Sequence, residues 1–123
     1  KLTLFRLKGD EKSKELFEFF ANEESIEWGL SRIGTNVSGS NILSTVGRQG
    51  DEWGGPYLFE KGYTVRVFIH NHPSGLFGPS VDDMNTAGSE NKTVFKLYTE
   101  EDGYLDFNQY GIMREPIEVN PDE

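Results

Sequence analysis

Runs of β-branched and aromatic residues, together with alternating apolar and polar positions, predict most of the strands in this chain. The clearest run covers residues 63–70, YTVRVFIH, and ends on a histidine. Residues 26–34 alternate apolar with polar side chains, the period of a half-buried strand, and Glu27 points away from the apolar face. Further strands are expected at residues 2–7, 41–46, 93–99 and 104–108. The last two strands are expected to form a hairpin.

Two helices are predicted, each from a different signal. Residues 12–22 carry apolar side chains at i, i+3 and i+4 spacing, which is typical of an amphipathic helix. These apolar residues are Leu16, Phe19 and Phe20. The second signal is Ser80 followed three residues later by Asp83, the signature of a capped helix start, which predicts a helix over residues 80–89.

The segments between these elements differ in character. Residues 47–55, GRQGDEWGG, are rich in glycine and charge, which predicts a loop and a candidate lid over a nearby site. Trp28 and the phenylalanines of residues 12–22 are expected in the core, because aromatic side chains at strand or helix spacing usually pack there. The last residues, 120–123, are expected to fray.

Composition narrows the class of protein. The chain has 123 residues, 35% of them hydrophobic, which suits one domain with a single modest core. A net charge of −9 would repel nucleic acid, so no nucleic-acid partner is expected. With no cysteine, the strong metal ligands left are His, Asp and Glu. No stretch is apolar enough to span a membrane, so we expect a soluble domain, and Lys1 in place of methionine suggests a domain cut from a longer polypeptide.

The chain has two histidines, and both follow the strongest predicted strand. His70 and His72 are two positions apart, so in extended backbone their rings project to the same side. Asp83, at a helix start, could supply a third ligand and leave a position open for water, as in catalytic zinc sites. Each residue also has an ordinary interpretation: histidines near a turn are often only hydrogen-bonded, and Ser80 and Asp83 suit a helix cap with or without metal.

The whole string around these residues carries more information than the two histidines. HNHPSG at residues 70–75, Ser80 eight positions after His72, and Asp83 three positions later resemble the HxHx7Sx2D motif of the JAMM (MPN+) metallopeptidases. That resemblance implies a single MPN/JAB (cytidine-deaminase-like) α/β domain over residues 1–123, with a mixed curved sheet flanked by helices. It also implies that His70, His72 and Asp83 bind one zinc ion with a water, and that Ser80 helps to hold the oxyanion.

The same family uses a glutamate upstream of the histidines as general acid and base. It lies on the strand after the first helix, a position that Glu27 matches in this chain. Glu23 and Glu24 are alternatives, but they fall where the predicted helix ends. The ordinary interpretation of Glu27 is a solvent-facing strand residue.

Two branches of the family compete. HNHPSG followed by PS and Asp83 resembles RadC-type proteins, which are associated with DNA repair. ELFEFFAN, SIEWGLS, FIHNHPSG and KLYTEEDGYLDFN together resemble the JAB-like toxin domains at the C-terminal ends of bacterial polymorphic-toxin and Rhs-type proteins. The toxin branch implies a secreted or delivered effector that cleaves a peptide or isopeptide bond in a target-cell protein, in the manner of a deubiquitinase, and a cognate immunity protein. A non-catalytic MPN scaffold is a further alternative, and other divalent ions could replace zinc.

Overall fold

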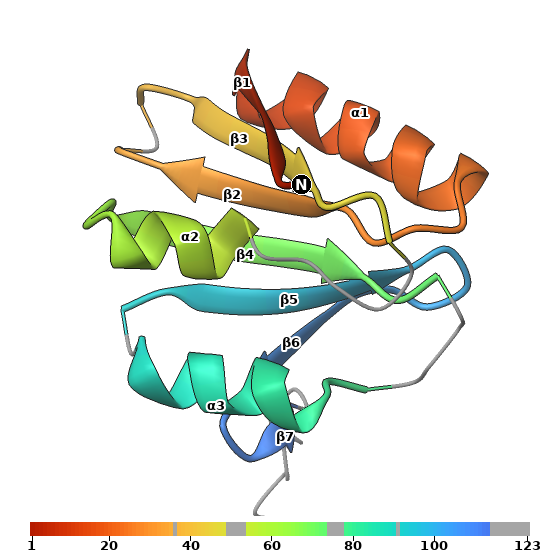
Figure 1. The fold of residues 1–123 in the computed structure, drawn as a ribbon, viewed down its shortest axis with the longest axis vertical. Coiled ribbons are helices and arrows are strands. Elements are labelled where there is room, and N and C mark those ends of the chain that lie inside the picture. The colour runs from red at the N-terminus through yellow and green to blue at the C-terminus, as the bar shows by residue number, and fades with distance from the viewer. Residues whose placement is uncertain (36, 49–53, 74–77, 91, 114–123) are drawn as a thin grey trace, which may run out of the picture.

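A mixed, curved β-sheet forms the centre of the molecule, and helices cover both of its faces (Figure 1). The computed structural model describes residues 1–35, 37–48, 54–73, 78–90 and 92–113. The strands are β1 (Thr3–Lys8), β2 (Gly29–Ile33), β3 (Ser40–Thr45), β4 (Val65–Asn71), β5 (Val94–Thr99), β6 (Gly103–Asn108) and β7 (Gly111–Ile112). The helices are α1 (Asp10–Glu23), α2 (Gly54–Glu60) and α3 (Val81–Ser89). The expected mixed sheet flanked by helices is therefore confirmed.

The strand order is β1-β3-β2-β4-β5-β6-β7. Neighbouring strands are antiparallel except for β4 and β5, which are parallel. A parallel pair needs a crossover connection, and α3 lies within it. The start of α3 therefore follows the carboxyl end of β4, the end of a strand at which ligand sites form in α/β sheets.

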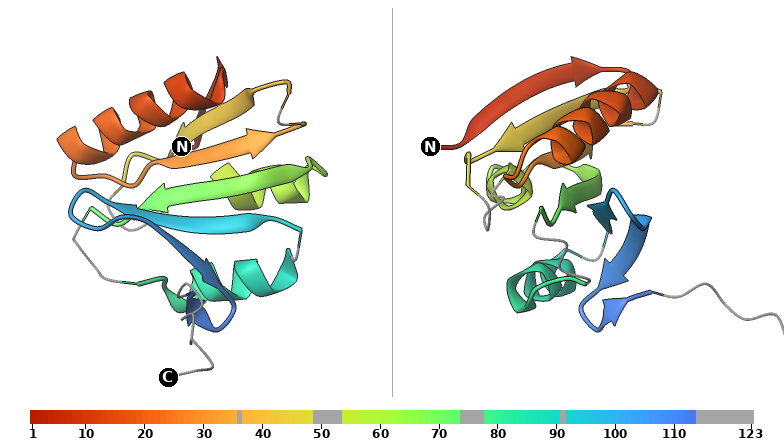
Figure 2. Two further views of the ribbon diagram at one scale, coloured as in Figure 1. Left: turned by 180° about the vertical axis from the view of Figure 1, so that it is seen from behind. Right: turned by 90° about the vertical axis from the view of Figure 1, so that its right-hand side faces the viewer.

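Helix α1 covers one face of the sheet (Figure 2). Beneath it lies a cluster of buried side chains: Phe17, Trp28, Leu30, Leu43, Ile69 and Tyr98. Phe17 is fully buried, whereas Phe19 is 59% exposed, so the expectation that Phe19 belongs to the core is wrong. Helix α1 begins at Asp10, before the predicted start, and the side of the helix that carries Ser13 and Phe17 is the buried one.

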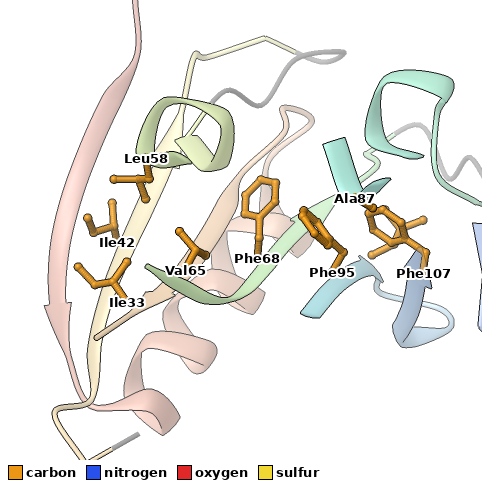
Figure 3. Packing of buried hydrophobic residues seen from close by; sticks show 9 residues of the cluster. Ile33, Ile42, Leu58, Val65, Phe68, Ala87, Phe95 and Phe107 are labelled. Carbon is orange, nitrogen blue, oxygen red and sulfur yellow. The ribbon is translucent and has the colours of Figure 1, made fainter. Parts of the chain in front are cut away.

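Helices α2 and α3 pack on the opposite face of the sheet (Figure 3). The cluster there consists of Ile33, Ile42, Leu58, Val65, Phe68, Ala87, Phe95, Leu97 and Phe107. Leu58 comes from α2 and Ala87 from α3, so both helices are fixed to the sheet by apolar burial. None of the helices in the described ranges is long and apolar enough to cross a membrane.

Helix α2 was not predicted, because its first residues, Gly54, Gly55 and Pro56, are poor helix formers. Proline is nevertheless tolerated in the first turn of a helix, where its missing N–H would have no helical partner. Residues 49–53, most of the predicted lid, lie outside the described residues. The short strand β7 was also missed, and β2 is shorter than predicted, so Glu27 lies just before it.

Gly55 permits a close approach between α2 and β4. A Cβ atom at this position would lie 2.7 Å from the ring of Phe68, which is 5% exposed. We expect Gly55→Ala to lower the free energy of unfolding by about 1–3 kcal/mol, because a buried ring held by its neighbours must move. Urea denaturation of the purified variant measures this loss.

The control for Gly55→Ala is Gly88→Ala in α3. A Cβ atom there would meet Gln109 Oε1 at 2.8 Å and Gln109 Cβ at 3.1 Å, and Gln109 lies exposed in a turn, where its side chain can move away. Because alanine is favoured over glycine in a helix by about 1 kcal/mol, this variant should be at least as stable as the native protein. Equal stability of both variants would contradict the close contact at Gly55.

Candidate metal centre

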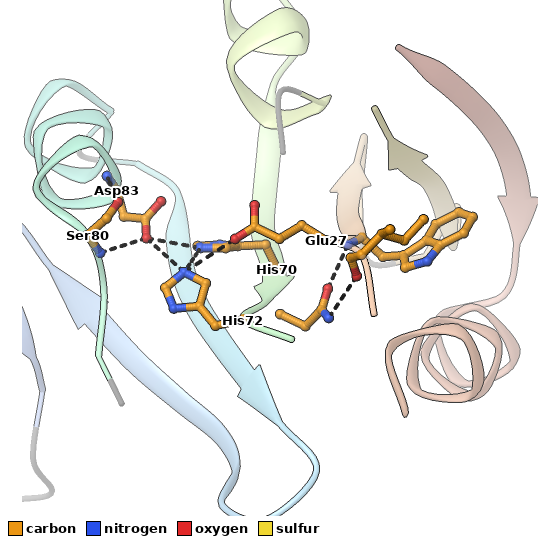
Figure 4. A network of polar contacts seen from close by, with 8 residues as sticks. Glu27, His70, His72, Ser80 and Asp83 are labelled. Atoms are coloured by element: carbon orange, nitrogen blue, oxygen red, sulfur yellow. Dashed lines mark hydrogen bonds and ion pairs between the residues drawn. The ribbon is translucent and has the colours of Figure 1, made fainter. Parts of the chain in front are cut away.

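Strand β4 carries His70, and His72 comes directly after it. His70 is 2% exposed and pairs with Gly29 in β2 on one side and with Leu97 in β5 on the other. His72 follows the last residue of β4, and its side chain is 8% exposed. The two Nε2 atoms lie 3.2 Å apart, so the rings converge as the i, i+2 spacing predicts (Figure 4).

Asp83 supplies the third atom of this cluster from the first turn of α3. Its Oδ2 lies 3.1 Å from His70 Nε2 and 3.3 Å from His72 Nε2. Ligand atoms bound at about 2.0–2.1 Å to a tetrahedral zinc ion lie about 3.3 Å from one another. The three separations in this cluster agree with that spacing, and two imidazoles with one carboxylate are a donor set that zinc accepts. The residues therefore fit a bound zinc ion.

The cap of α3 orients the Asp83 carboxylate. Ser80 N–H donates a hydrogen bond of 2.8 Å to Asp83 Oδ2, and Ser80 Oγ accepts one of 3.1 Å from Asp83 N–H. This is a complete capping box. The oxygen that closes the box is the same Oδ2 that faces the histidines, so one carboxylate can cap the helix and at the same time face a metal ion.

The charge state of Asp83 also suits a ligand. Burial acts to raise its pKa, but hydrogen bonds from His70 and His72, and the one from the Ser80 backbone, act in the opposite direction. The net result is a pKa far below the usual range of an aspartate. Asp83 is therefore ionised at neutral pH, in the form that binds a metal ion.

Glu27 lies at the edge of the same cluster. Its Oε1 is 3.6 Å from His72 Nε2, and its side chain is 8% exposed (Figure 4). A solvent-facing glutamate would not be buried in this way, so the ordinary interpretation of Glu27 is wrong. Glu23 and Glu24 are exposed at the end of α1. Of the three glutamates considered, Glu27 is the one that the structure brings to the histidines.

Phe68 is a further neighbour of the centre, one that the sequence motif does not include. Its ring stacks on that of His70, with centroids 5.6 Å apart and planes inclined by 20°. Phe107 contacts the same imidazole edge-on, at 6.0 Å between centroids. The signal for Phe68 was its position two residues before His70, which places both side chains on one face of the strand. The core of the α2 face therefore continues directly into the metal centre.

The fold and the centre together define a small mixed α/β domain with a candidate metal site of two histidines and one aspartate. A family model described as JAB-like toxin 1 matches residues 5–88, more than half of the chain. The chain belongs to this family of JAB-like toxin domains, as the sequence resemblance predicted. No curated protein and no solved structure matched the chain.

Proposed function

We propose that this domain is a zinc-dependent hydrolase that cleaves a peptide or isopeptide bond in a protein, and that it acts as the toxin domain of a bacterial effector. The observation that carries the proposal is the meeting of three ligand atoms, 3.1–3.3 Å apart, with a buried carboxylate beside them. Three ligands leave a position for water, whereas structural zinc sites are closed by four.

His70, His72 and Asp83 would hold the ion. A zinc ion at this position would activate water and polarise an amide carbonyl, the two requirements for hydrolysis of a stable amide. Because the histidine side chains are almost fully buried, their orientation is fixed by the surrounding core before any ion binds.

Glu27 is the residue proposed to move protons. Its carboxylate lies close enough to the ligand cluster to take a proton from an attacking water through a single hydrogen bond. The same carboxylate would then deliver that proton to the leaving amine nitrogen.

Ser80 is proposed to stabilise the oxyanion that forms on the carbonyl. In the capping box its hydroxyl acts as an acceptor, so this bond does not use the O–H proton. The hydroxyl is exposed at the start of α3, next to the ligand Asp83, and can donate toward a substrate. Donors already in place before the charge develops are effective in acyl transfer.

The substrate class and partners are part of the proposal. Membership of a JAB-like toxin family supports a target-cell protein as substrate, with a ubiquitin-like C-terminus among the candidates, and a cognate immunity protein as partner. A domain of net charge −9 is unsuited to bind DNA, which argues against a DNA-associated role.

The test combines metal analysis with cleavage. Purified protein is stripped with a chelator, reloaded with one equivalent of zinc and incubated with a panel of ubiquitin-like and peptide fusions. We expect cleavage by the zinc-loaded protein and its absence in the stripped protein. Stoichiometric zinc without cleavage of any fusion would instead favour a non-catalytic scaffold, and tight binding to DNA at physiological salt would favour the DNA-associated branch.

A further inference from the structure

Asn71 lies between the two histidines and is 2% exposed. Its side-chain amide contacts the segment that contains Glu27. Oδ1 accepts a hydrogen bond of 2.6 Å from Trp28 N–H, and Nδ2 donates one of 3.3 Å to the carbonyl of Ile26. Both polar groups of this buried amide therefore bind the two residues that flank Glu27, and the donor and acceptor they meet determine which way the amide faces.

These contacts extend the sheet beyond its regular ladder. Strand β2 begins at Gly29, so residues 26–28 lie before the strand. The backbone N–H of Asn71 also bonds to the carbonyl of Trp28, at 3.3 Å. The side chain of Asn71 adds bonds to Trp28 N–H and to the Ile26 carbonyl, in the segment that precedes the first paired residue of β2.

The other side of this segment is held by the chain around the end of β3. Glu27 N–H donates to the carbonyl of Arg48 at 2.9 Å, and Thr45 Oγ1 donates to the carbonyl of Glu27 at 2.6 Å. Thr45 and Arg48 thus bind the backbone of Glu27 itself. Asn71 binds the backbone of its two neighbours, Ile26 and Trp28. Such an arrangement restricts both the position and the direction of the Glu27 side chain.

We infer that Asn71 is a positioning residue for Glu27, which it holds at the correct place relative to the metal ligands. The inference rests on the proposed function, in which Glu27 moves the proton. Because Asn71 is adjacent in sequence to both histidines, one residue ties the position of the carboxylate to that of the ligands. A displacement of about 1 Å at a catalytic group can cost about 100-fold in rate.

A matched control separates positioning from general stability. Asn41 in β3 is also a fully buried asparagine with its amide in use: Nδ2 donates to Asp10 Oδ1 at 2.9 Å, and Oδ1 accepts from Arg32 at 3.0 Å. Arg32, its partner across the sheet, is three residues beyond Gly29, the residue paired with His70. Asn41→Ala should therefore lower stability without changing the centre.

The experiment compares Asn71→Ala with Asn41→Ala in zinc-loaded protein. Asn71→Ala should lower kcat about 100-fold with zinc stoichiometry retained, whereas Asn41→Ala should leave kcat unchanged. In a Glu27→Gln background, Asn71→Ala should cause no further loss, because residues that act through one another are not additive. Hydrogen exchange of the Trp28 amide in metal-free protein should be about fivefold faster in Asn71→Ala alone, the effect of losing one hydrogen bond.

The outcomes separate the inference from the function on which it rests. Unchanged kcat in Asn71→Ala, in a protein that Glu27→Gln inactivates, overturns the inference and leaves the function standing. If the native protein cleaves none of the substrates, the proposed function is wrong. Hydrogen exchange of the Trp28 amide then tests the inference by itself. Faster exchange in Asn71→Ala supports the inference, and unchanged exchange overturns it. Should Asn71→Ala fail to fold, Asn71→Asp keeps the acceptor for Trp28 N–H but loses the donor to the Ile26 carbonyl, so kcat should still fall, and an unchanged kcat would overturn the inference.

Discussion

Replacement of Glu27 by glutamine is expected to lower kcat by about 100- to 10,000-fold, the range for loss of a general acid–base group. Glutamine keeps the size and the hydrogen-bonding capacity of the side chain but cannot take up a proton. Because Glu27 is not one of the three proposed ligands, the variant should bind zinc in the same stoichiometry as the native protein. Elemental analysis and steady-state kinetics on the same sample measure both quantities.

The matched control is Glu24→Gln, which makes the same chemical change three residues upstream. Glu24 is exposed at the end of α1, and its substitution should leave kcat unchanged. If Glu27→Gln retained the native rate, Glu27 would have no part in proton transfer. If instead it lost zinc, the carboxylate would have to be counted among the ligands.

The second large effect is expected from His72→Ala, which removes one of the three proposed ligands and should abolish cleavage. Loss of a residue that only hydrogen-bonds to a ligand can lower metal affinity by about 100-fold. Loss of the ligand itself should lower zinc affinity by more than this. Competition with a chromophoric chelator measures the affinity. Native-like circular dichroism of the metal-free variant would show that the loss is one of ligation rather than of folding.

Two neighbouring aspartates in α3 provide a control for ligand loss. Asp83→Asn keeps an oxygen able to accept from Ser80 N–H, so the helix cap can persist while the anionic ligand is lost. Asp82→Asn makes the same change of charge at an exposed position in the same turn. Zinc binding should be lost in the first variant and kept in the second. Equal affinities in the two variants would exclude Asp83 as a ligand.

Sequence patterns predicted the meeting of His70, His72 and Asp83 because each depends on local rules. Strand periodicity places the two rings on one side, and the capping signature places Asp83 at a helix start. His72 and Ser80 are eight positions apart in the sequence, so the predicted strand end and the predicted helix start must lie near each other. Family resemblance added Glu27, which local patterns alone would assign to the surface.

What the sequence could not predict depends on contacts between distant segments. β1 pairs with β3, not with its nearest strand in sequence, and no local pattern encodes that choice. Helix α2 begins with residues of low helix propensity and depends on the packing of Leu58 against the sheet. The buried position of Glu27 likewise depends on distant segments, because its backbone bonds to Thr45 and Arg48 and its neighbour Trp28 bonds to Asn71.

The centre combines ligands that are close in sequence with a carboxylate that is remote. His70 and Asp83 are 13 positions apart, whereas the hydrogen bond from Trp28 to Asn71 spans 43 positions. Because closing a longer loop costs more entropy, the ligands should meet first during folding. On the proposed function, the zinc ion would then bind before Glu27 reaches the position from which it can take part in cleavage. In refolding experiments with a zinc-responsive dye, metal uptake should precede the recovery of cleavage.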